Sequence, residues 1–338
     1  MTEKRFDVVT LGRSSIDLYS NDSGAPFPEI TSFGAFVGGC PTNIAVGTRR
    51  LGLRAALVTG VGDDPVGAFV LRFLRNEGVE TAHVLEKKGM RTAAVLLGIE
   101  PPDKFPLVFY RDRPPDLELT IDDVLAAPIA DTRVLVVTGT GLSRDPSRSA
   151  TLFAMERARE SGATVVLDLD FRADQWHDAR AFGVTVRSAL PLVDIAIGTE
   201  AEVKASQLGG RADVGVGAGM SSPEVAGDLD RAIAAILGAG RGPCCTLVLK
   251  RGVDGATIHA KGSAEKVAPF PVDVVNVLGA GDAFASGFLY GLVRGWTLTK
   301  AARMGNATGA IVVGRQSCAN AMPTETEALA FVADRGGF

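Results

Sequence analysis

Short runs of β-branched and other apolar residues recur along the chain, and stretches with a helical spacing of apolar residues separate most of them. The apolar runs are Asp7–Leu11, Ala55–Thr59, Val134–Thr138, Thr164–Leu167, Ile195–Ile197 and Thr246–Lys250. The amphipathic stretches include Pro65–Glu77, Ser147–Ser161 and Asp228–Gly238. Apolar strands that alternate with helices of this length are typical of βαβ units in an α/β fold. Because such crossovers are right-handed, the sequence predicts a three-layer α/β/α sandwich with a mainly parallel central sheet.

Two segments depart from this rhythm. Residues 14–38 are rich in Gly, Pro and Ser, and residues 91–118 contain two strand-like stretches, Ala93–Ile99 and Leu107–Arg111. We expect the two segments to form a small β-sheet that projects from the main body as a lid; two separate surface loops are the alternative. The chain contains no repeat of fixed period and no low-complexity tract, which argues against a solenoid. We expect residues 1–338 to form a single domain that carries this lid.

The composition is that of an ordinary globular protein, with 46% apolar and 22% charged residues among 338. The net charge of −4 and the lack of a polybasic stretch give no electrostatic reason to expect binding to nucleic acid or to a membrane surface. No apolar run reaches the roughly 18 residues that span a bilayer, and the N-terminus has no signal region, so we expect a cytoplasmic protein. The four cysteines form no CxxC pair and the three histidines are scattered, which argues against structural zinc.

The most informative stretch lies near the C-terminus, where Gly279-Ala280-Gly281-Asp282 precedes an apolar helical pattern. A helix entrance presents unpaired backbone N–H groups and the positive end of the helix dipole, and glycines let the backbone approach an anion closely. Phosphoryl transfer needs such an anion site together with a carboxylate that can reach the attacking hydroxyl group. The segment therefore indicates phosphoryl transfer with Asp282 as the base, and a plain helix cap is the alternative role for Asp282.

Two motifs of the chain resemble signatures of the PfkB, or ribokinase-like, family of carbohydrate kinases. They are Gly38-Gly39-Cys40-Pro41-Thr42-Asn43-Ile44-Ala45 and Gly279-Ala280-Gly281-Asp282. Their order and wide separation match the family, and the resemblance covers essentially the whole chain. Within the family, the chain is most similar to the 5-dehydro-2-deoxygluconokinases of inositol catabolism. The segments that carry this likeness are Thr10–Arg13, Asp17–Tyr19, Pro101–Asp103, Phe105–Leu107, Phe109–Arg111, Asp168–Arg172, Asn276–Leu278 and Cys318–Pro323.

The resemblance implies an ATP-dependent sugar-acid kinase that transfers the γ-phosphate to the 6-hydroxyl of 5-dehydro-2-deoxy-D-gluconate. In that assignment Asp282 takes the proton from the acceptor hydroxyl, and the N–H groups of Gly279, Ala280 and Gly281 bind the transferring phosphoryl group. The chemistry agrees, because catalysis of phosphoryl transfer is mainly positioning and charge stabilisation. A kinase for another sugar, such as 2-keto-3-deoxygluconate or fructose, is the nearest alternative, since few substitutions change a sugar pocket.

Further residues match family positions that contact the sugar. Carboxylate and amide groups pair with either side of a hydroxyl, and a guanidinium can hold a substrate carboxylate or oxo group in a forked pair. The alternative roles are turn and helix positions for the N-terminal residues and a solvated lid position for Arg111. The substrate-binding residues implied by the resemblance are Asp17, Gly38, Gly39, Asn43, Arg111 and Arg172.

Nucleotide-binding and metal-binding positions also follow from the resemblance, which implies ATP and Mg²⁺. Lys250 and Gly252 match a segment that passes the nucleotide phosphates, and Asn306 matches a later helix of the nucleotide pocket. Glu202 matches a glutamate that holds Mg²⁺ through water, which suits an ion that keeps several waters. A solvated helix face is the alternative for Glu202.

Many relatives bind a monovalent cation near an Asp-Thr pair that this chain replaces by Asn276 and Val277. The replacement removes a charge and a hydroxyl group, so the resemblance leaves potassium dependence open.

Functions of two other classes compete with the kinase. A non-catalytic sugar sensor would keep the fold and lose the chemistry, but the intact Gly279–Asp282 segment argues against it. A dinucleotide-binding oxidoreductase would have a GxGxxG turn after the first strand, where the chain has Gly12-Arg13-Ser14 instead. The expected partners are therefore ATP and a small sugar or sugar acid, and an apolar outer face on the lid sheet would allow a homodimer through the lid.

Overall fold

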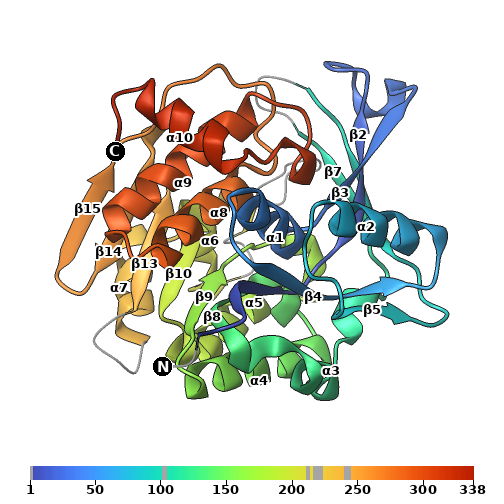
Figure 1. Ribbon diagram of the computed structural model, residues 1–338, viewed down its shortest axis with the longest axis horizontal. Helices are drawn as coiled ribbons and strands as arrows, with labels where there is room; N and C mark the ends of the chain where they lie inside the picture. The colour runs from blue at the N-terminus through green and yellow to red at the C-terminus, as the bar shows by residue number, and fades with distance from the viewer. Residues whose placement is uncertain (1–2, 101–104, 211–213, 216–223, 240–244) are drawn as a thin grey trace.

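The computed structural model describes residues 3–100, 105–210, 214–215, 224–239 and 245–338. Within these ranges the main body is a nine-stranded sheet with helices on both faces (Figure 1). The strands from β13 to β5 pair in parallel, and β14 and β15 add antiparallel pairs at one edge. The order across the sheet is β15 (Ser263–Val267), β14 (Ala256–Ala260), β13 (Thr246–Lys250), β10 (Ile195–Thr199), β9 (Thr164–Asp168), β8 (Thr132–Thr138), β1 (Phe6–Leu11), β4 (Ala55–Gly62) and β5 (Val84–Lys87).

Two layers of helices bury the sheet. One face is covered by α1 (Cys40–Arg50), α2 (Pro65–Asn76), α8 (Ala280–Val293), α9 (Leu298–Val313) and α10 (Glu325–Ala333). The other face is covered by α3 (Ile121–Ala126), α4 (Ser147–Glu160), α5 (Ala179–Ala189), α6 (Glu200–Ala205) and α7 (Leu229–Ala239). Successive strand residues point to opposite faces, so Val8 packs in the first layer and Val9 in the second. None of the described helices is long and apolar enough to cross a membrane.

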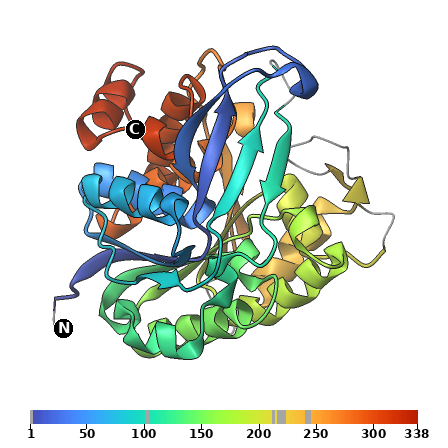
Figure 2. The ribbon, with the colours of Figure 1, turned by 90° about the vertical axis from the view of Figure 1, so that its right-hand side faces the viewer.

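A second sheet is built by the two segments that depart from the strand–helix rhythm. Among the described residues its order is β3 (Phe33–Gly38), β2 (Ser15–Ser20), β6 (Ala93–Leu97) and β7 (Leu107–Tyr110). β2 pairs antiparallel with β3 and parallel with β6, and β6 pairs antiparallel with β7. In Figures 1 and 2 this sheet stands up from the main body next to α1 and α2. Val108 and Tyr110 on its edge strand are exposed, and closure as a lid or pairing with a second copy stays a prediction.

The predicted sandwich with its small additional sheet is confirmed. The predicted strand Thr246–Lys250 forms with both of its ends as predicted, and the other predicted strands form with shifted ends. The largest shift is in β4, which continues past the predicted end at Thr59 to Gly62. The strand continues because Gly60 and Gly62 have no side chains, so the backbone at Pro115 and Met90 can pack directly against it. A methyl group added at Gly60 would lie 2.4 Å from the carbonyl oxygen of Pro115, and one at Gly62 would lie 2.5 Å from that of Met90.

Candidate active site

Polar side chains gather where the parallel strands of the central sheet end. Arg13 follows β1, Asp168 ends β9, Glu202 lies in the helix after β10, and Lys250 ends β13. The carboxyl ends of parallel strands meet at the same edge of a sheet, which is where ligands bind in open α/β folds. This edge is therefore the candidate active site.

Asp282 lies in the first turn of α8 and faces the first turn of α1. Asn43 Nδ2 donates a hydrogen bond of 2.7 Å to Asp282 Oδ2. Neither helix has a side-chain cap, because the N-cap residue is Gly39 for α1 and Gly279 for α8. The carboxylate of Asp282 is thus held from α1, across the site, and does not cap its own helix.

Burial controls the protonation of Asp282. Desolvation raises the pKa of this carboxyl, and the charge of Asp170 raises it further, while the hydrogen bond from Asn43, the nearby Cys40 thiol and the charge of Lys250 lower it. The net effect is a raised pKa. A general base works best when its pKa lies close to the operating pH. Burial therefore makes Asp282 a better proton acceptor than an exposed aspartate.

The N-terminus of α8 leaves backbone donors for an anion. Gly279 has a left-handed φ of 82°, and the N–H of Ala280 makes a long contact of 3.4 Å with a carbonyl of the preceding turn. Among the described residues, the N–H groups of Gly281 and Asp282 have no hydrogen-bond acceptor. Lys250 Nζ lies against the same turn, since a methyl group added at Gly281 would be 3.2 Å from it. Positive charge and unpaired donors therefore meet beside Asp282.

Lys250 is shared between this turn and Asp168. Its Nζ lies 3.3 and 3.4 Å from the two carboxylate oxygens of Asp168. Burial raises the pKa of Asp168 to about 7, against the effect of Lys250 and together with that of nearby Glu202. Burial alone would lower the pKa of Lys250, but the surrounding carboxylates, Asp168 first, raise it. The ammonium group therefore stays charged at neutral pH.

Asp17 lies beneath the glycine pair that joins β3 to α1. Its Oδ1 accepts a hydrogen bond of 2.8 Å from Ser15 Oγ. A methyl group at Gly38 would lie 1.9 Å from Asp17 Oδ2, and one at Gly39, where φ is 104°, would lie 2.6 Å from the carbonyl oxygen of Arg13. Only glycine fits so close to these groups. Burial raises the pKa of Asp17 to about 6, although Ser15 and Arg13 act to lower it.

Asp170 lies between two arginines at the same edge. Its Oδ2 accepts a hydrogen bond of 2.9 Å from Thr140 Oγ1, and Arg172 Nε lies 3.3 Å from its Oδ1. A terminal nitrogen of Arg13 stands farther off, 3.9 Å from Oδ2. Burial alone would raise the pKa of Asp170, but the charges of Arg172 and Arg13 lower it. Asp170 also has a φ of 33°, an uncommon backbone conformation that is often found at functional sites.

Arg111, predicted to reach the substrate from the small sheet, forms a buried forked ion pair with Asp116. Its two terminal nitrogens donate hydrogen bonds of 3.0 and 2.9 Å to the two carboxylate oxygens, and the side chains are 5% and 1% exposed. The charge of Arg111 still acts to lower the pKa of Asp17, so Arg111 lies within electrostatic reach of that carboxyl. Direct contact with the substrate stays a prediction.

Gly252 and Asn306, predicted to contact the nucleotide, have different surroundings. Gly252 is exposed with a φ of 57°, and a methyl group added there would meet nothing within 4 Å. Asn306 is buried, and its Nδ2 donates hydrogen bonds of 3.2 and 2.8 Å to the carbonyl oxygens of Val267 and Ala268. Asn306 therefore fastens α9 to the end of β15, whereas Gly252 leaves open space over the turn after β13.

Glu202 is buried, so the alternative of a solvated helix face is wrong. Its Oε2 accepts a hydrogen bond of 2.7 Å from the N–H of Thr199, which forms a capping box at the start of α6. Among the described residues, no three or more His, Cys, Asp or Glu side chains are grouped to hold a metal ion. Mg²⁺ needs only one or two protein carboxylates where phosphates and water complete its coordination shell. The carboxylates of Glu202 and nearby Asp168 fit this requirement.

Several residues of this site were given no role from the sequence, although they lie in segments that carry the family resemblance. Asp168 and Asp170 are two charged residues at the end of an apolar strand, a signal that could have found them. Tyr19 and Cys318 carry no such signal, because their contact joins distant parts of the chain: Tyr19 OH lies 2.5 Å from Cys318 Sγ. A methyl group added at Gly279 would lie 2.9 Å from the same sulfur. Strand β2 of the small sheet therefore reaches the turn that begins α8.

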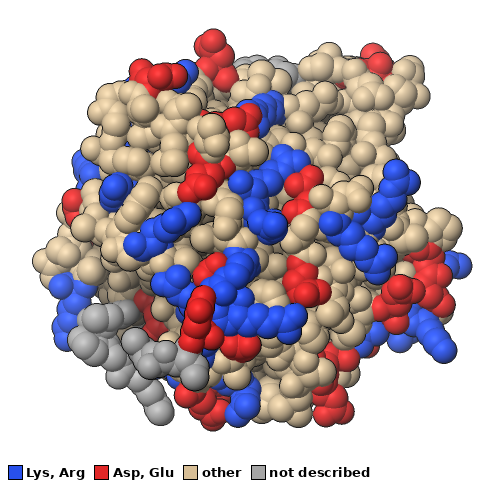
Figure 3. All heavy atoms as spheres, in the orientation of Figure 1, with Lys and Arg blue, Asp and Glu red and all other residues tan. Residues whose placement is uncertain are grey.

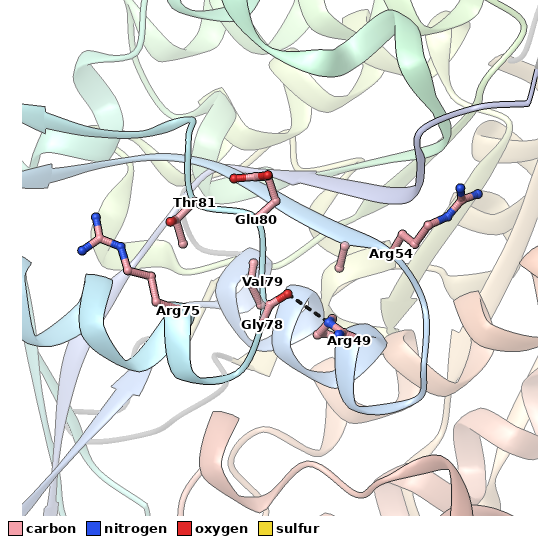
Figure 4. Close-up of a pocket in the computed structure, with 8 residues that line it drawn as sticks. Arg49, Arg54, Arg75, Gly78, Val79, Glu80 and Thr81 are labelled. Carbon is pink, nitrogen blue, oxygen red and sulfur yellow. Dashed lines mark hydrogen bonds between the residues drawn. The ribbon is translucent and has the colours of Figure 1, made fainter.

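A cavity of about 410 Å³ lies at the opposite, amino end of the strands, where Ala55 begins β4. Arg49, Arg54 and Arg75 line it, but Figure 4 shows Arg54 and Arg75 pointing to opposite sides. Arg49 Nε donates its hydrogen bond to the carbonyl oxygen of Gly78 at 2.9 Å. On the face drawn in Figure 3, basic and acidic side chains are interspersed. The arginines therefore do not converge on one ligand, and the carboxyl edge remains the candidate site.

We expect Gly279→Ala to destabilise the protein by about 1–3 kcal/mol and to lower turnover, because the methyl group meets Cys318 and the left-handed backbone disfavours alanine. Gly238→Ala is the matched control: it lies in α7 with nothing within 4 Å, so its stability should be unchanged or higher by up to about 1 kcal/mol. Denaturant unfolding measures both variants. A Gly279→Ala protein as stable as Gly238→Ala would contradict the packing argument.

The raised pKa of Asp17 gives stability a defined pH dependence. Because the folded-state pKa of about 6 exceeds the ordinary aspartate pKa of 3.8, the stabilising contribution of this group is fully present below pH 3.8 and is lost as pH rises through 6. Asp17→Asn removes the titration. The free energy of unfolding of the variant, relative to wild type, should therefore increase by about 3 kcal/mol between about pH 4 and about pH 7.5. Denaturant unfolding across this range tests it, and a difference that does not vary with pH would rule out the titration.

Comparison with known proteins identifies full-length relatives. The chain is 34% identical over 332 residues to the 5-dehydro-2-deoxygluconokinase of Geobacillus kaustophilus (strain HTA426), which covers 98% of this chain and 94% of that protein. It is also 34% identical over 334 residues to the protein of the same name from Shouchella clausii (strain KSM-K16), with 98% and 97% covered.

Solved structures show the same architecture. Fructokinase from Vibrio cholerae O395, in a form with fructose, ADP and calcium ion bound, superposes with a TM-score of 0.79 at 25% identity over 96% of this chain and 99% of that one. Fructokinase with bound ATP from Xylella fastidiosa superposes with a TM-score of 0.82 at 23% identity over 97% and 98%, which shows the shared fold. The model of the pfkB family carbohydrate kinases matches residues 5–325. With its full-length relatives, its ribokinase-like fold and the Gly-Ala-Gly-Asp turn at the sheet edge, the chain belongs to the pfkB family of carbohydrate kinases.

Proposed function

We propose that the protein transfers the γ-phosphate of ATP to the 6-hydroxyl of 5-dehydro-2-deoxy-D-gluconate, a step of myo-inositol catabolism. Relatives that carry the name of this activity, 34% identical over nearly the whole chain, support the substrate. The observation that carries the chemistry is the carboxylate of Asp282. It is held by Asn43 at 2.7 Å, beside the uncapped start of α8 and the ammonium group of Lys250.

In this proposal Asp282 accepts the proton of the acceptor hydroxyl as that oxygen attacks the γ-phosphorus. A bond forms between the acceptor oxygen and phosphorus, and the bond from phosphorus to the β-phosphate oxygen breaks, which leaves ADP. The N–H groups of Gly279, Ala280 and Gly281 and the charge of Lys250 stabilise the negative charge on the transferring group. The raised pKa of Asp282 assists the first step because it brings the base nearer to neutral pH.

The remaining assignments divide the edge into a sugar side and a nucleotide side. The small sheet of residues 14–38 and 91–118 serves as the lid over the sugar. Asp17 is suited to binding hydroxyl groups because a carboxyl that titrates near neutral pH can accept or donate a hydrogen bond. The sugar side comprises Asp17, Gly38, Gly39, Asn43, Arg111 and Arg172. The nucleotide side comprises Lys250, Gly252 and Asn306.

Mg²⁺, when bound, would neutralise charge on the nucleotide phosphates. Glu202 is the residue we assign to hold it through water. No residue is assigned to a monovalent cation, because Asn276 is buried and its Oδ1 already accepts a hydrogen bond of 3.0 Å from the N–H of Leu278. We therefore expect the side chain at this position to serve the turn before α8.

Fructose is a second candidate acceptor. It is favoured by the superposition with the fructose-bound fructokinase at 25% identity over 96% of this chain. The two candidates differ in charge, since one is a sugar acid and the other a neutral ketose. The same Asp282 chemistry serves both.

We expect Asp282→Asn to lower kcat by roughly 10²–10⁴-fold, the usual contribution of a general base, with a melting temperature equal to or above that of wild type. Stability is retained because burial disfavours the charge that the substitution removes. Asp334→Asn, at an exposed position after α10, is the matched control and should keep full activity. An Asp282→Asn enzyme with wild-type kcat would refute the role of the base.

A coupled assay of ADP release on a panel of sugars and sugar acids tests the substrate. We expect the highest kcat/KM for 5-dehydro-2-deoxygluconate, and phosphorus NMR of the product should place the phosphate on the 6-oxygen. Higher kcat/KM for 2-keto-3-deoxygluconate or fructose would replace the proposed acceptor. Turnover that needs neither Asp282 nor a sugar would contradict the kinase itself.

A further inference from the structure

Arg13 is a buried cation at the edge of the proposed sugar pocket that the mechanism above does not use. It follows β1, and its side chain is only 8% exposed. Its backbone is fixed: Thr42 Oγ1 donates a hydrogen bond of 3.0 Å to the Arg13 carbonyl oxygen, and Gly39 packs against the same carbonyl. The side chain therefore starts from a rigid turn between the central sheet and α1.

The guanidinium of Arg13 has few partners. Among the described residues it donates no hydrogen bond, and its buried Nε has no acceptor. Its ion pair with Asp170 is long, at 3.9 Å, and Asp170 is already bonded by Thr140 and faced by Arg172 at 3.3 Å. An unpaired polar group costs free energy when it is buried, and a guanidinium carries five donors. Arg13 is thus a donor-rich group that has one long ion pair and no hydrogen-bond acceptor in the described part of the chain.

Arg111 shows what a satisfied guanidinium looks like in the same region. It donates two hydrogen bonds to Asp116, at 3.0 and 2.9 Å, and is equally buried. The protein thus completes the fork of Arg111 with its own carboxylate and leaves that of Arg13 incomplete. The difference points to a carboxylate that is supplied from outside the chain.

The surroundings of Arg13 also orient it. Its guanidinium carbon lies 5.5 Å from the centre of the Phe109 ring, on strand β7 of the small sheet. An aromatic face holds the guanidinium plane and leaves its edge for a forked pair with a planar anion. The charge of Arg13 acts on Asp17, and Asp282 acts on Asp17 as well. Asp17 therefore lies within electrostatic reach of both Arg13 and Asp282.

We propose that Arg13 binds the carboxylate of a sugar-acid substrate and thereby selects sugar acids over neutral sugars. The inference deepens the proposed function, on which it rests for the identity of the pocket. The acceptor hydroxyl then lies at Asp282, the central hydroxyls at Asp17, and the carboxylate end at Arg13. The pairing is charge-assisted and forked, which is the geometry that guanidinium and carboxylate share.

The test compares 5-dehydro-2-deoxygluconate with its neutral C1 amide in wild type, Arg13→Gln and Arg13→Lys. Wild type should prefer the acid. In Arg13→Gln, kcat/KM for the acid should fall roughly 10- to 100-fold, mainly through KM, while the value for the amide changes by less than about threefold. Arg13→Lys keeps the positive charge but cannot form the forked pair, so its kcat/KM for the acid should lie between those of wild type and Arg13→Gln. Arg159→Gln, an exposed arginine of α4 paired with Asp194, is the control and should change neither substrate.

A purely structural role for Arg13 predicts a different result. Loss of Arg13 would then disturb Asp170 and lower kcat/KM for the acid and the amide by the same factor, which would overturn the proposal. Calorimetric binding of the acid and the amide without ATP gives a second readout. If Arg13→Gln folds poorly, the wild-type and Arg13→Lys data decide, and equal affinity of wild type for acid and amide would also overturn the proposal.

Failure of the substrate assignment is distinguishable from failure of this inference. If wild type phosphorylates another sugar acid of the panel in place of 5-dehydro-2-deoxygluconate, the named substrate is wrong, and the same comparison with that acid and its amide tests Arg13. If wild type phosphorylates only neutral sugars, the role of Arg13 is overturned while the kinase chemistry stands.

Discussion

The hydrogen bond between Asn43 and Asp282 joins the first turns of α1 and α8, which are 239 residues apart in the chain. Its length depends on how closely these helices pack. A methyl group added at Gly47 would lie 2.3 Å from Ser286 Oγ, so the helices approach at a point where one has no side chain. Their apolar faces share one core with the central sheet, including Ile44. Since packed interiors resist small shifts, this helix contact fixes the direction in which the Asp282 carboxylate points. The position of the Asp282 carboxylate therefore depends on the contact between Gly47 and Ser286, one helical turn beyond Asn43 in α1.

Desolvation decides the electrostatics of the same edge. Burial is the largest influence on Asp17, Asp168 and Asp282, and it raises the pKa of each. The opposite charges are held by pairing: the carboxylates around Lys250 raise the pKa of its ammonium group despite burial, and Asp170 does the same for the guanidinium of Arg172. Low local dielectric strengthens each of these interactions, so the effect of an ammonium or guanidinium group on its neighbours depends strongly on where that group lies. Lys250 is effective because it touches both Asp168 and the turn at the start of α8.

Features formed by neighbouring residues could be predicted from the sequence, whereas contacts between residues far apart in the chain could not. The sandwich follows from apolar periodicity. The Gly279–Asp282 turn could be recognised from the sequence because its glycines and carboxylate are neighbours in the chain. The hydrogen bond that makes Asn43 a partner of the base is invisible before folding. Arg111 is the opposite case, because Asp116 is only five residues away, yet alternation alone does not show that both turn inward. Strand ends are misjudged where glycine continues a strand, as in β4, because backbone packing and not propensity decides there.

Strand β2 connects the two halves of the site. Asp17 and Tyr19 are two residues apart, and alternate residues of a strand point to the same face, so both turn toward the main body and are buried. Asp17 lies under the glycine pair before α1, while Tyr19 reaches Cys318 at 2.5 Å, against the glycine that begins α8. A displacement of β2 relative to α8 must therefore either break the contact with Cys318 or move the turn that begins α8 with it. Because the small sheet is hydrogen-bonded through β2, the proposed sugar side and the proposed anion-binding side cannot shift independently.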